Sequence, residues 1–313
     1  MIEPILHYLD VPGAKGQSNS PRRIAWWDWN ATGAPQPSRV VVCVHGLTRQ
    51  ARDFDRLAAA LAPCARVVCV DVAGRGHSDW LNDPMDYQLP TYASDLACLL
   101  AHLREEHATA HPGAAPGEFE LDWVGTSMGG LIGMVLAALP QAAINRLVLN
   151  DIGPEIDPAS LRRISSYLGK LRVFPSEEIA VQEIKQNCSS FGPHTPEQWL
   201  ALARPMLRPA AEGWILHYDP RIAVPFEQLL AATEAQALES APESPLWGLY
   251  DAIEAKTLLL RGAESDLLTP AAVQAMAGRG PRARCIEFAG VGHAPSLIPP
   301  DQIAAVKDFL FAS

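Results

Sequence analysis

Short runs of β-branched and other apolar residues recur along the chain, separated by segments long enough to form helices. Continuous apolar runs of this kind are typical of parallel strands buried on both faces of a sheet. Strands that alternate with helices predict an α/β fold, here a mostly parallel eight-stranded sheet with helices on both faces. The predicted strands span residues 5–9, 24–29, 40–44, 67–70, 119–124, 147–149, 257–260 and 285–288.

The alternation stops between about Pro154 and Leu246. This part has many prolines and no clear strand, but it has stretches with helical spacing. Those stretches span residues 159–168, 177–187, 197–207 and 225–235. The sequence therefore predicts an α/β core built from residues 1–153 and 246–313, with residues 154–245 inserted as a helical cap.

The charge balance is acidic. The chain carries 35 Asp and Glu residues against 25 Lys and Arg residues, a formal net charge of −10. No basic patch is visible, so we expect no nucleic-acid partner.

No apolar run approaches the ~18 residues of a membrane helix, and the first residues lack the basic region of a secretory signal. The six cysteines show no CxxC spacing, which favours free thiols and a cytoplasmic protein without a membrane partner.

The segment Gly125-Thr126-Ser127-Met128-Gly129 matches G-x-S-x-G and lies directly between a predicted strand and a predicted helix. A sharp strand-to-helix turn presents the serine hydroxyl, and small residues on either side let strand and helix approach closely. The start of the helix supplies free N–H groups for a developing oxyanion. This context predicts Ser127 as a catalytic nucleophile.

A serine nucleophile needs a base, and the base needs an orienting acid. His293 follows the last predicted strand in a glycine-rich loop, which favours it as the base over His45 and His77. For the acid we expect Asp266, which follows the strand at 257–260, with Glu264 of the same loop second and Asp151, after the strand at 147–149, as the rival. The predicted catalytic residues are therefore Ser127, Asp266 and His293.

Two histidines on one predicted helix, His102 and His107, offer no metal site. A spacing of five places them ~140° apart around the helix, so they cannot share an ion. We expect neither a metal nor an organic cofactor.

Together these residues resemble the α/β-hydrolase superfamily over nearly the whole chain. Three further pieces agree: VHGLT at 44–48, DVAGRGHSD at 71–79, and the pair Gly292-His293. The resemblance implies the α/β-hydrolase fold and an oxyanion hole made by the N–H groups of Leu47 and Met128.

The resemblance also implies a reaction. Members with an Asp nucleophile (haloalkane dehalogenases, epoxide hydrolases) or a Cys nucleophile (dienelactone hydrolases) differ from this chain at Ser127. We therefore expect a carboxylic ester hydrolase for small to medium acyl esters, acting through an acyl-enzyme on Ser127, as a monomer or homodimer with a small-molecule substrate. The alternatives are a C–C bond hydrolase or lactonase with the same triad, or a ligand receptor or signalling protein that retains it.

Substrate specificity is expected in the cap and beside the oxyanion loop. Arg49 follows that loop, where it could meet a substrate carboxylate, and Trp214 and Tyr218 are candidates for lining an acyl pocket. The cap arginines Arg163 and Arg172, together with Arg162, raise the same idea of an anionic substrate.

Overall fold

One eight-stranded sheet forms the centre of the molecule, in the order β1-β2-β4-β3-β5-β6-β9-β10. The computed structural model describes residues 2–13, 21–238 and 243–312. Strand β2 pairs antiparallel with β1 and β4, and all the other neighbours pair parallel, which confirms the predicted α/β architecture. The strands are β1 Ile5–Val11, β2 Arg22–Trp29, β3 Arg39–Val44, β4 Arg66–Asp71, β5 Glu120–Thr126, β6 Arg146–Asn150, β9 Lys256–Gly262 and β10 Arg284–Phe288.

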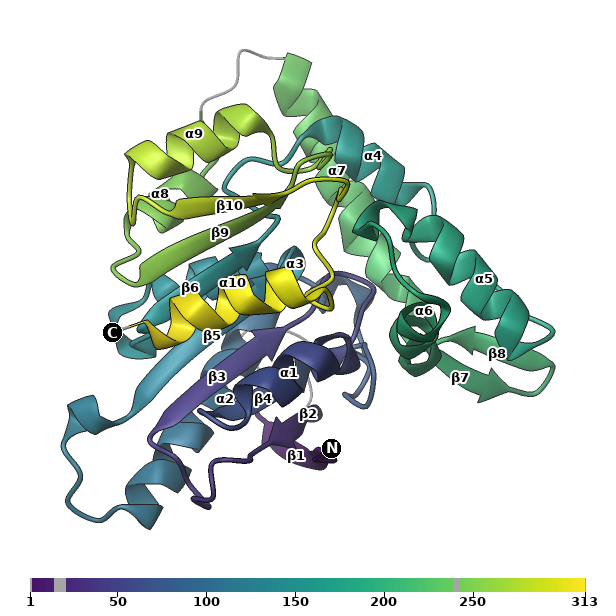
Figure 1. Cartoon of the computed structure of the whole chain (residues 1–313). Coiled ribbons are helices and arrows are strands. Elements are labelled where there is room, and N and C mark those ends of the chain that lie inside the picture. Colours follow the sequence, from purple (N-terminus) through teal and green to yellow (C-terminus); the bar gives the residue numbers. More distant parts are fainter. Residues whose placement is uncertain (1, 14–20, 239–242, 313) are drawn as a thin grey trace.

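Helices cover both faces of this sheet (Figure 1). Successive residues of β3 point to opposite faces, so Val41 packs against one helical layer and Val42 against the other. Helices α1 (Asp55–Leu61) and α10 (Pro300–Phe311) lie on the first face. The second face is covered by α2 Leu89–Ala110, α3 Met128–Ala137, α8 Leu246–Asp251 and α9 Pro270–Gly278. Among the described helices, none combines the length and the apolarity needed to cross a bilayer.

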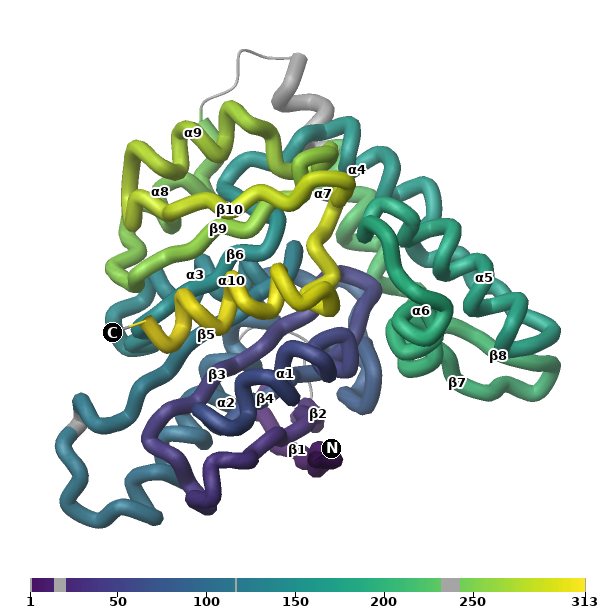
Figure 2. The backbone as a smooth tube through the Cα atoms, viewed as in Figure 1, coloured from purple at the N-terminus to yellow at the C-terminus, as the bar shows by residue number. Residues whose placement is uncertain are grey.

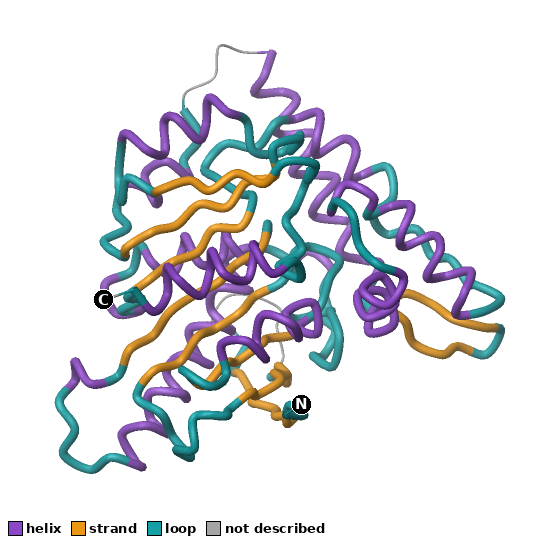
Figure 3. Tube along the Cα trace, viewed as in Figure 1, coloured by secondary structure: helices purple, strands orange, loops and turns teal. Residues whose placement is uncertain are grey.

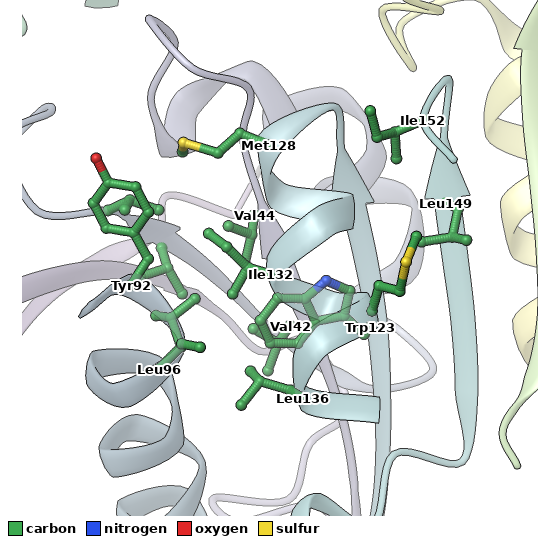
Figure 4. Packing of buried hydrophobic residues seen from close by; sticks show 14 of the residues in the cluster. Val42, Val44, Tyr92, Leu96, Trp123, Met128, Ile132, Leu136, Leu149 and Ile152 are labelled. Atoms are coloured by element: carbon green, nitrogen blue, oxygen red, sulfur yellow. The ribbon is translucent and has the colours of Figure 1, made fainter. Parts of the chain in front are cut away.

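The contact between β5 and α3 is centred on Trp123, whose side chain is fully buried. Figure 4 shows its ring beside α3, near Ile132 and Leu136. Its indole N–H donates to the carbonyl oxygen of Gly129 at 3.0 Å. A Cβ atom at Gly133 would lie 2.3 Å from the indole nitrogen, so only glycine allows this close approach. The first turn of α3 is thereby fixed against the strand that precedes it.

Between β6 and β9 the chain leaves the sheet and forms a separate layer, which we call the cap (Figure 2). Its α-helices are α4 Pro158–Ser165, α5 Glu177–Asn187, α6 Pro196–Ala203 and α7 Ala223–Leu238.

The cap also contains a short hairpin that the sequence analysis missed, drawn as two orange strands apart from the main sheet in Figure 3. Strands β7 (Leu207–Ala210) and β8 (Gly213–Leu216) pair antiparallel, where a helix had been predicted to continue to residue 207. That helix ends at Ala203, because Pro205 cannot supply the N–H that a continuing helix needs.

Two aromatic residues pack where the chain returns from the cap to the core. Trp247 and Tyr250 lie on α8 and are buried against the second face of the sheet. The Tyr250 hydroxyl donates to the carbonyl oxygen of Met276 at 2.8 Å, and the Trp247 indole donates to Glu155 at 2.8 Å. Both rings therefore stabilise the return of the chain from the cap to the sheet.

Candidate active site

Ser127 stands at the sharp turn between β5 and α3. Its backbone has φ 51° and ψ −117°, a strained conformation for a residue with a side chain. A Cβ atom at Gly125 would lie 2.3 Å from the carbonyl oxygen of Gly129, and one at Gly129 would lie 2.0 Å from that of Val44. Both glycines are therefore required by the close approach of backbones, as the G-x-S-x-G pattern predicts.

The imidazole of His293 lies between Ser127 and an aspartate. Its Nε2 atom lies 3.0 Å from the Ser127 hydroxyl, and its Nδ1 atom lies 2.7 Å from Oδ2 of Asp151. A carboxylate only accepts hydrogen bonds, so we assign the proton to Nδ1, which leaves Nε2 free to accept the serine proton. The arrangement can therefore activate a serine hydroxyl for attack on a carbonyl carbon.

Asp151 is fully buried and its carboxylate is held by groups of the core. The Gly262 N–H donates to Oδ1 at 3.0 Å, and the Ser265 hydroxyl donates to Oδ2 at 2.6 Å. Asp151 follows β6 directly and has a left-handed backbone, with φ 56°. These contacts fix the orientation of the carboxylate toward His293.

The expectation that Asp266 is the acid partner of His293 is wrong. Asp266 instead accepts two hydrogen bonds from Arg163 of α4, at 2.6 and 2.9 Å, and about half of its side chain is exposed. Strands β6 and β9 are neighbours in the sheet, so an acid after either one could reach the same histidine. The sequence offered both positions and could not show that the backbone turns Asp151 inward.

The loop after β3 brings two further groups to the serine. A Cβ atom at Gly46 would lie 3.6 Å from the Cβ atom of Ser127, so the loop passes close to the Ser127 side chain. Within the described part of the chain, the backbone N–H groups of Leu47 and Met128 have no hydrogen-bond acceptor. Two unpaired donors beside a serine nucleophile are what an oxyanion hole requires.

His45 orients one of these donors. Its Nδ1 atom lies 2.7 Å from the carbonyl oxygen of Gly46, and its Nε2 atom accepts from the Val72 N–H at 3.0 Å. Burial lowers the pKa of His45 to about 3, so the ring is neutral and Nδ1 carries the proton. The Gly46 carbonyl and the Leu47 N–H belong to one planar trans peptide, so fixing the oxygen also fixes the N–H on the opposite side.

Arg75 also supports the loop after β3, and the sequence analysis missed this role. Its side chain is fully buried and donates to the carbonyl oxygens of Leu47 and Ala73, at 2.8 and 2.6 Å, and to the Tyr92 hydroxyl at 2.9 Å. It belongs to the DVAGRGHSD turn, whose glycines and serine were the only recognisable signal. Nothing in the sequence indicated that the arginine between the glycines turns inward.

Two cavities meet at Ser127 and share the lining residues Leu47, Ser127 and Ile164. One, of about 200 Å³, is lined by His293 and by several charged side chains, and we call it the cation-lined cavity. Its charged residues other than His293 are Arg49, Arg163, Lys170, Arg172 and Glu183. The other, of about 490 Å³, is the apolar cavity, and no charged side chain of the described residues lines it. Its walls include Met128, Leu131, Ile152, Leu161, Phe226 and Leu229.

The three predicted substrate-binding residues have different positions. Tyr218 lines the cation-lined cavity. Arg49 also lines it, but its buried guanidinium is held by Asp53 through two hydrogen bonds, at 2.6 and 2.7 Å, and by the carbonyl oxygen of Leu202 at 3.0 Å. Trp214 lines neither cavity, because β8 places it in the hydrophobic cluster of the cap. Arg49 thus ties the core loop to the cap rather than offering a free charge.

Comparison with known proteins gives consistent matches. The model of the "Alpha/beta hydrolase family" matches residues 41–306. A 3-hydroxybutyrate-oligomer hydrolase of Cupriavidus necator is 45% identical over 92% of both chains. A pimeloyl-[acyl-carrier protein] methyl ester esterase of Stenotrophomonas maltophilia is 27% identical over 87% of this chain and 93% of its own. The crystal structure of an alpha/beta hydrolase from Novosphingobium aromaticivorans is 34% identical, with a TM-score of 0.78 and 99% of both chains covered.

Proposed function

The chain belongs to the alpha/beta hydrolase family and is an ester hydrolase, and on this basis we propose that it acts as a serine hydrolase on short-chain carboxylic esters through an acyl-enzyme. One observation carries the proposal. The chain of hydrogen bonds from Ser127 through His293 to Asp151 has the lengths needed to deprotonate a serine hydroxyl.

In the first step His293 accepts the proton of Ser127 as the serine oxygen attacks the ester carbonyl carbon. Asp151 stabilises the imidazolium that forms, and the N–H groups of Leu47 and Met128 donate to the oxyanion. His293 then gives the proton to the departing alcohol. In the second step a water molecule, deprotonated by the same histidine, releases the acid from Ser127.

The 45% identical relative suggests the substrate class. We propose that the substrate is a short linear oligoester of 3-hydroxybutyrate or of a similar hydroxy acid. Two cavities that meet at Ser127 suit this substrate, because each can hold the part of the chain on one side of the scissile ester. The lining of the apolar cavity by aliphatic and aromatic side chains suits methyl-bearing units.

The test is the rate of hydrolysis of p-nitrophenyl esters from acetate to dodecanoate, and of the 3-hydroxybutyrate dimer and trimer, by wild type and Ser127→Ala. We expect turnover by wild type with an optimum at short acyl chains, and loss of turnover in Ser127→Ala. A burst of one equivalent without turnover would contradict an enzymatic role and favour a triad-bearing receptor. Cleavage of vinylogous 1,5-diketones in place of esters would overturn the ester assignment in favour of C–C bond hydrolysis.

A further inference from the structure

The two cavities at Ser127 differ in charge and in their relation to the catalytic histidine. His293 lines the cation-lined cavity and not the apolar cavity. Met128, the oxyanion donor at the start of α3, lines the apolar cavity and not the other. The site is therefore unsymmetrical around the nucleophile, and an unsymmetrical substrate has a preferred direction in it.

The histidine decides which part of the substrate occupies which cavity. His293 must protonate the oxygen that leaves, so the alcohol part of the ester lies on the side of His293. That side is the cation-lined cavity. The acyl part then extends into the apolar cavity.

In a linear oligoester of a hydroxy acid, the alcohol part of each ester is the part that leads to the free carboxylate. We propose, resting on the function proposed above, that the cation-lined cavity binds this terminal carboxylate, so that single hydroxy-acid units are removed from the carboxylate end. The protein as a whole has a negative net charge and does not attract a carboxylate. The preference for the carboxylate end of the substrate therefore comes from the cations that line this cavity.

Among the lining cations, Lys170 is the one free to bind a substrate carboxylate. Arg49 is bound by Asp53, Arg163 by Asp266, and Arg172 by Glu183. Lys170 is exposed at the cavity, and its ammonium group contacts no hydrogen-bond or ion-pair partner in the described residues.

The cavity sizes favour the same direction. The cation-lined cavity of about 200 Å³ suits one short unit, whereas the apolar cavity of about 490 Å³ has room for a longer acyl portion.

The balanced reaction forms a bond from the Ser127 oxygen to the carbonyl carbon and breaks the bond to the alcohol oxygen. The alcohol oxygen takes a proton from His293, and the hydroxy-acid monomer that contains this oxygen leaves. Water then converts the shortened acyl-enzyme to a free acid and restores the serine hydroxyl.

The experiment compares a 3-hydroxybutyrate trimer with the same trimer whose terminal carboxylate is replaced by a neutral carboxamide. Wild type is expected to favour the free acid by about fivefold in kcat/KM, the upper range for a partly exposed ion pair. The preference should shrink in 0.5 M salt, because salt screens such pairs. With the carboxylate-end unit isotopically labelled, the first monomer released should carry the label.

The Lys170→Gln variant should lose this preference, so that it hydrolyses the free acid and the carboxamide with similar kcat/KM. Lys185→Gln, on the exposed part of α5 and outside the cavity lining, is the matched control and should behave as wild type. Equal wild-type rates on acid and carboxamide, or release of the unlabelled end first, would overturn the proposal. Absence of Ser127-dependent hydrolysis of both trimers would instead overturn the function on which it rests.

Discussion

His293 and Asp151 are 142 residues apart in the chain, yet Nδ1 of the histidine lies 2.7 Å from Oδ2 of the aspartate. The aspartate lies at the end of β6, in the interior of the sheet, and the histidine follows β10 at its edge. The loop after β10 therefore spans the end of β9 to bring the imidazole to its partner.

This relationship predicts a large difference between two aspartate variants. Asp151→Asn should lower kcat by about 10⁴-fold, because an amide in that position favours the wrong histidine tautomer. Asp266→Asn should keep kcat within a few-fold of wild type, because its carboxylate pairs with Arg163 and not with His293. Steady-state kinetics on one short ester measures both. A collapse of kcat in Asp266→Asn alone would restore Asp266 as the acid.

The close approach of backbones at Gly129, beside Ser127, predicts that alanine is tolerated less well there than at Gly248 on α8. In Gly129→Ala the new Cβ would lie 2.0 Å from the Val44 carbonyl oxygen, so backbone must shift, and we expect a loss of at least about 2 kcal/mol in the free energy of unfolding. In Gly248→Ala the Cβ meets no atom within 4 Å, and the helical position should gain up to about 1 kcal/mol. Urea unfolding of both variants tests this, and equal stabilities would contradict it.

Arg75 predicts an effect on kcat that passes through the oxyanion loop. Arg75→Met removes the hydrogen bond to the Leu47 carbonyl oxygen, so kcat should fall at least about tenfold with a smaller change in KM. Tyr92→Phe keeps that hydrogen bond and removes only the hydroxyl that Arg75 also contacts, so it should remain close to wild type. If Arg75→Met loses only thermal stability and keeps the kcat of wild type, Arg75 has no positioning role.

His217 predicts a pH dependence of stability. Burial, with the nearby charges of His77 and Arg208, lowers the pKa of His217 to about 4 in the folded chain, below the ordinary 6.5. The unfolded chain therefore binds the proton first as the pH falls. The contribution of this group to stability is complete above about pH 6.5 and is lost as the pH falls to about 4.

The His217→Gln variant should accordingly show a flatter dependence of unfolding free energy on pH between 6.5 and 4 than wild type. The change in slope stays below about 1.4 kcal/mol per pH unit, the limit for one titrating group, because the ring is only partly buried. Comparison with wild type cancels the carboxylates that titrate in the same range, including Asp71 with a pKa near 6. Parallel curves for the two proteins would show that His217 does not titrate there.

Much of the fold could be predicted from the sequence, because buried parallel strands leave continuous apolar runs such as 40–44 and 67–70. The hairpin of β7 and β8 could not be predicted, because its strands have four residues each and Pro209 interrupts the usual strand signal.

At the candidate site, the pairing of Ser127 with His293 could be predicted because their local sequence signals are strong. The aspartate that pairs with His293 could not, since Asp151 and Asp266 follow neighbouring strands and only tertiary structure tells them apart. The sequence could not show that Lys170 lacks a partner among the described residues, because this depends on which carboxylates the other cap cations contact.

The pair formed by Arg163 and Asp266 links the cap to the core without involving the groups bonded to His293. Asp151 takes its other hydrogen bonds from Gly262 and Ser265, which are core residues. Loss of this pair would therefore remove one contact between the cap and the core while leaving the hydrogen bonds from His293 to Asp151 and Ser127 in place.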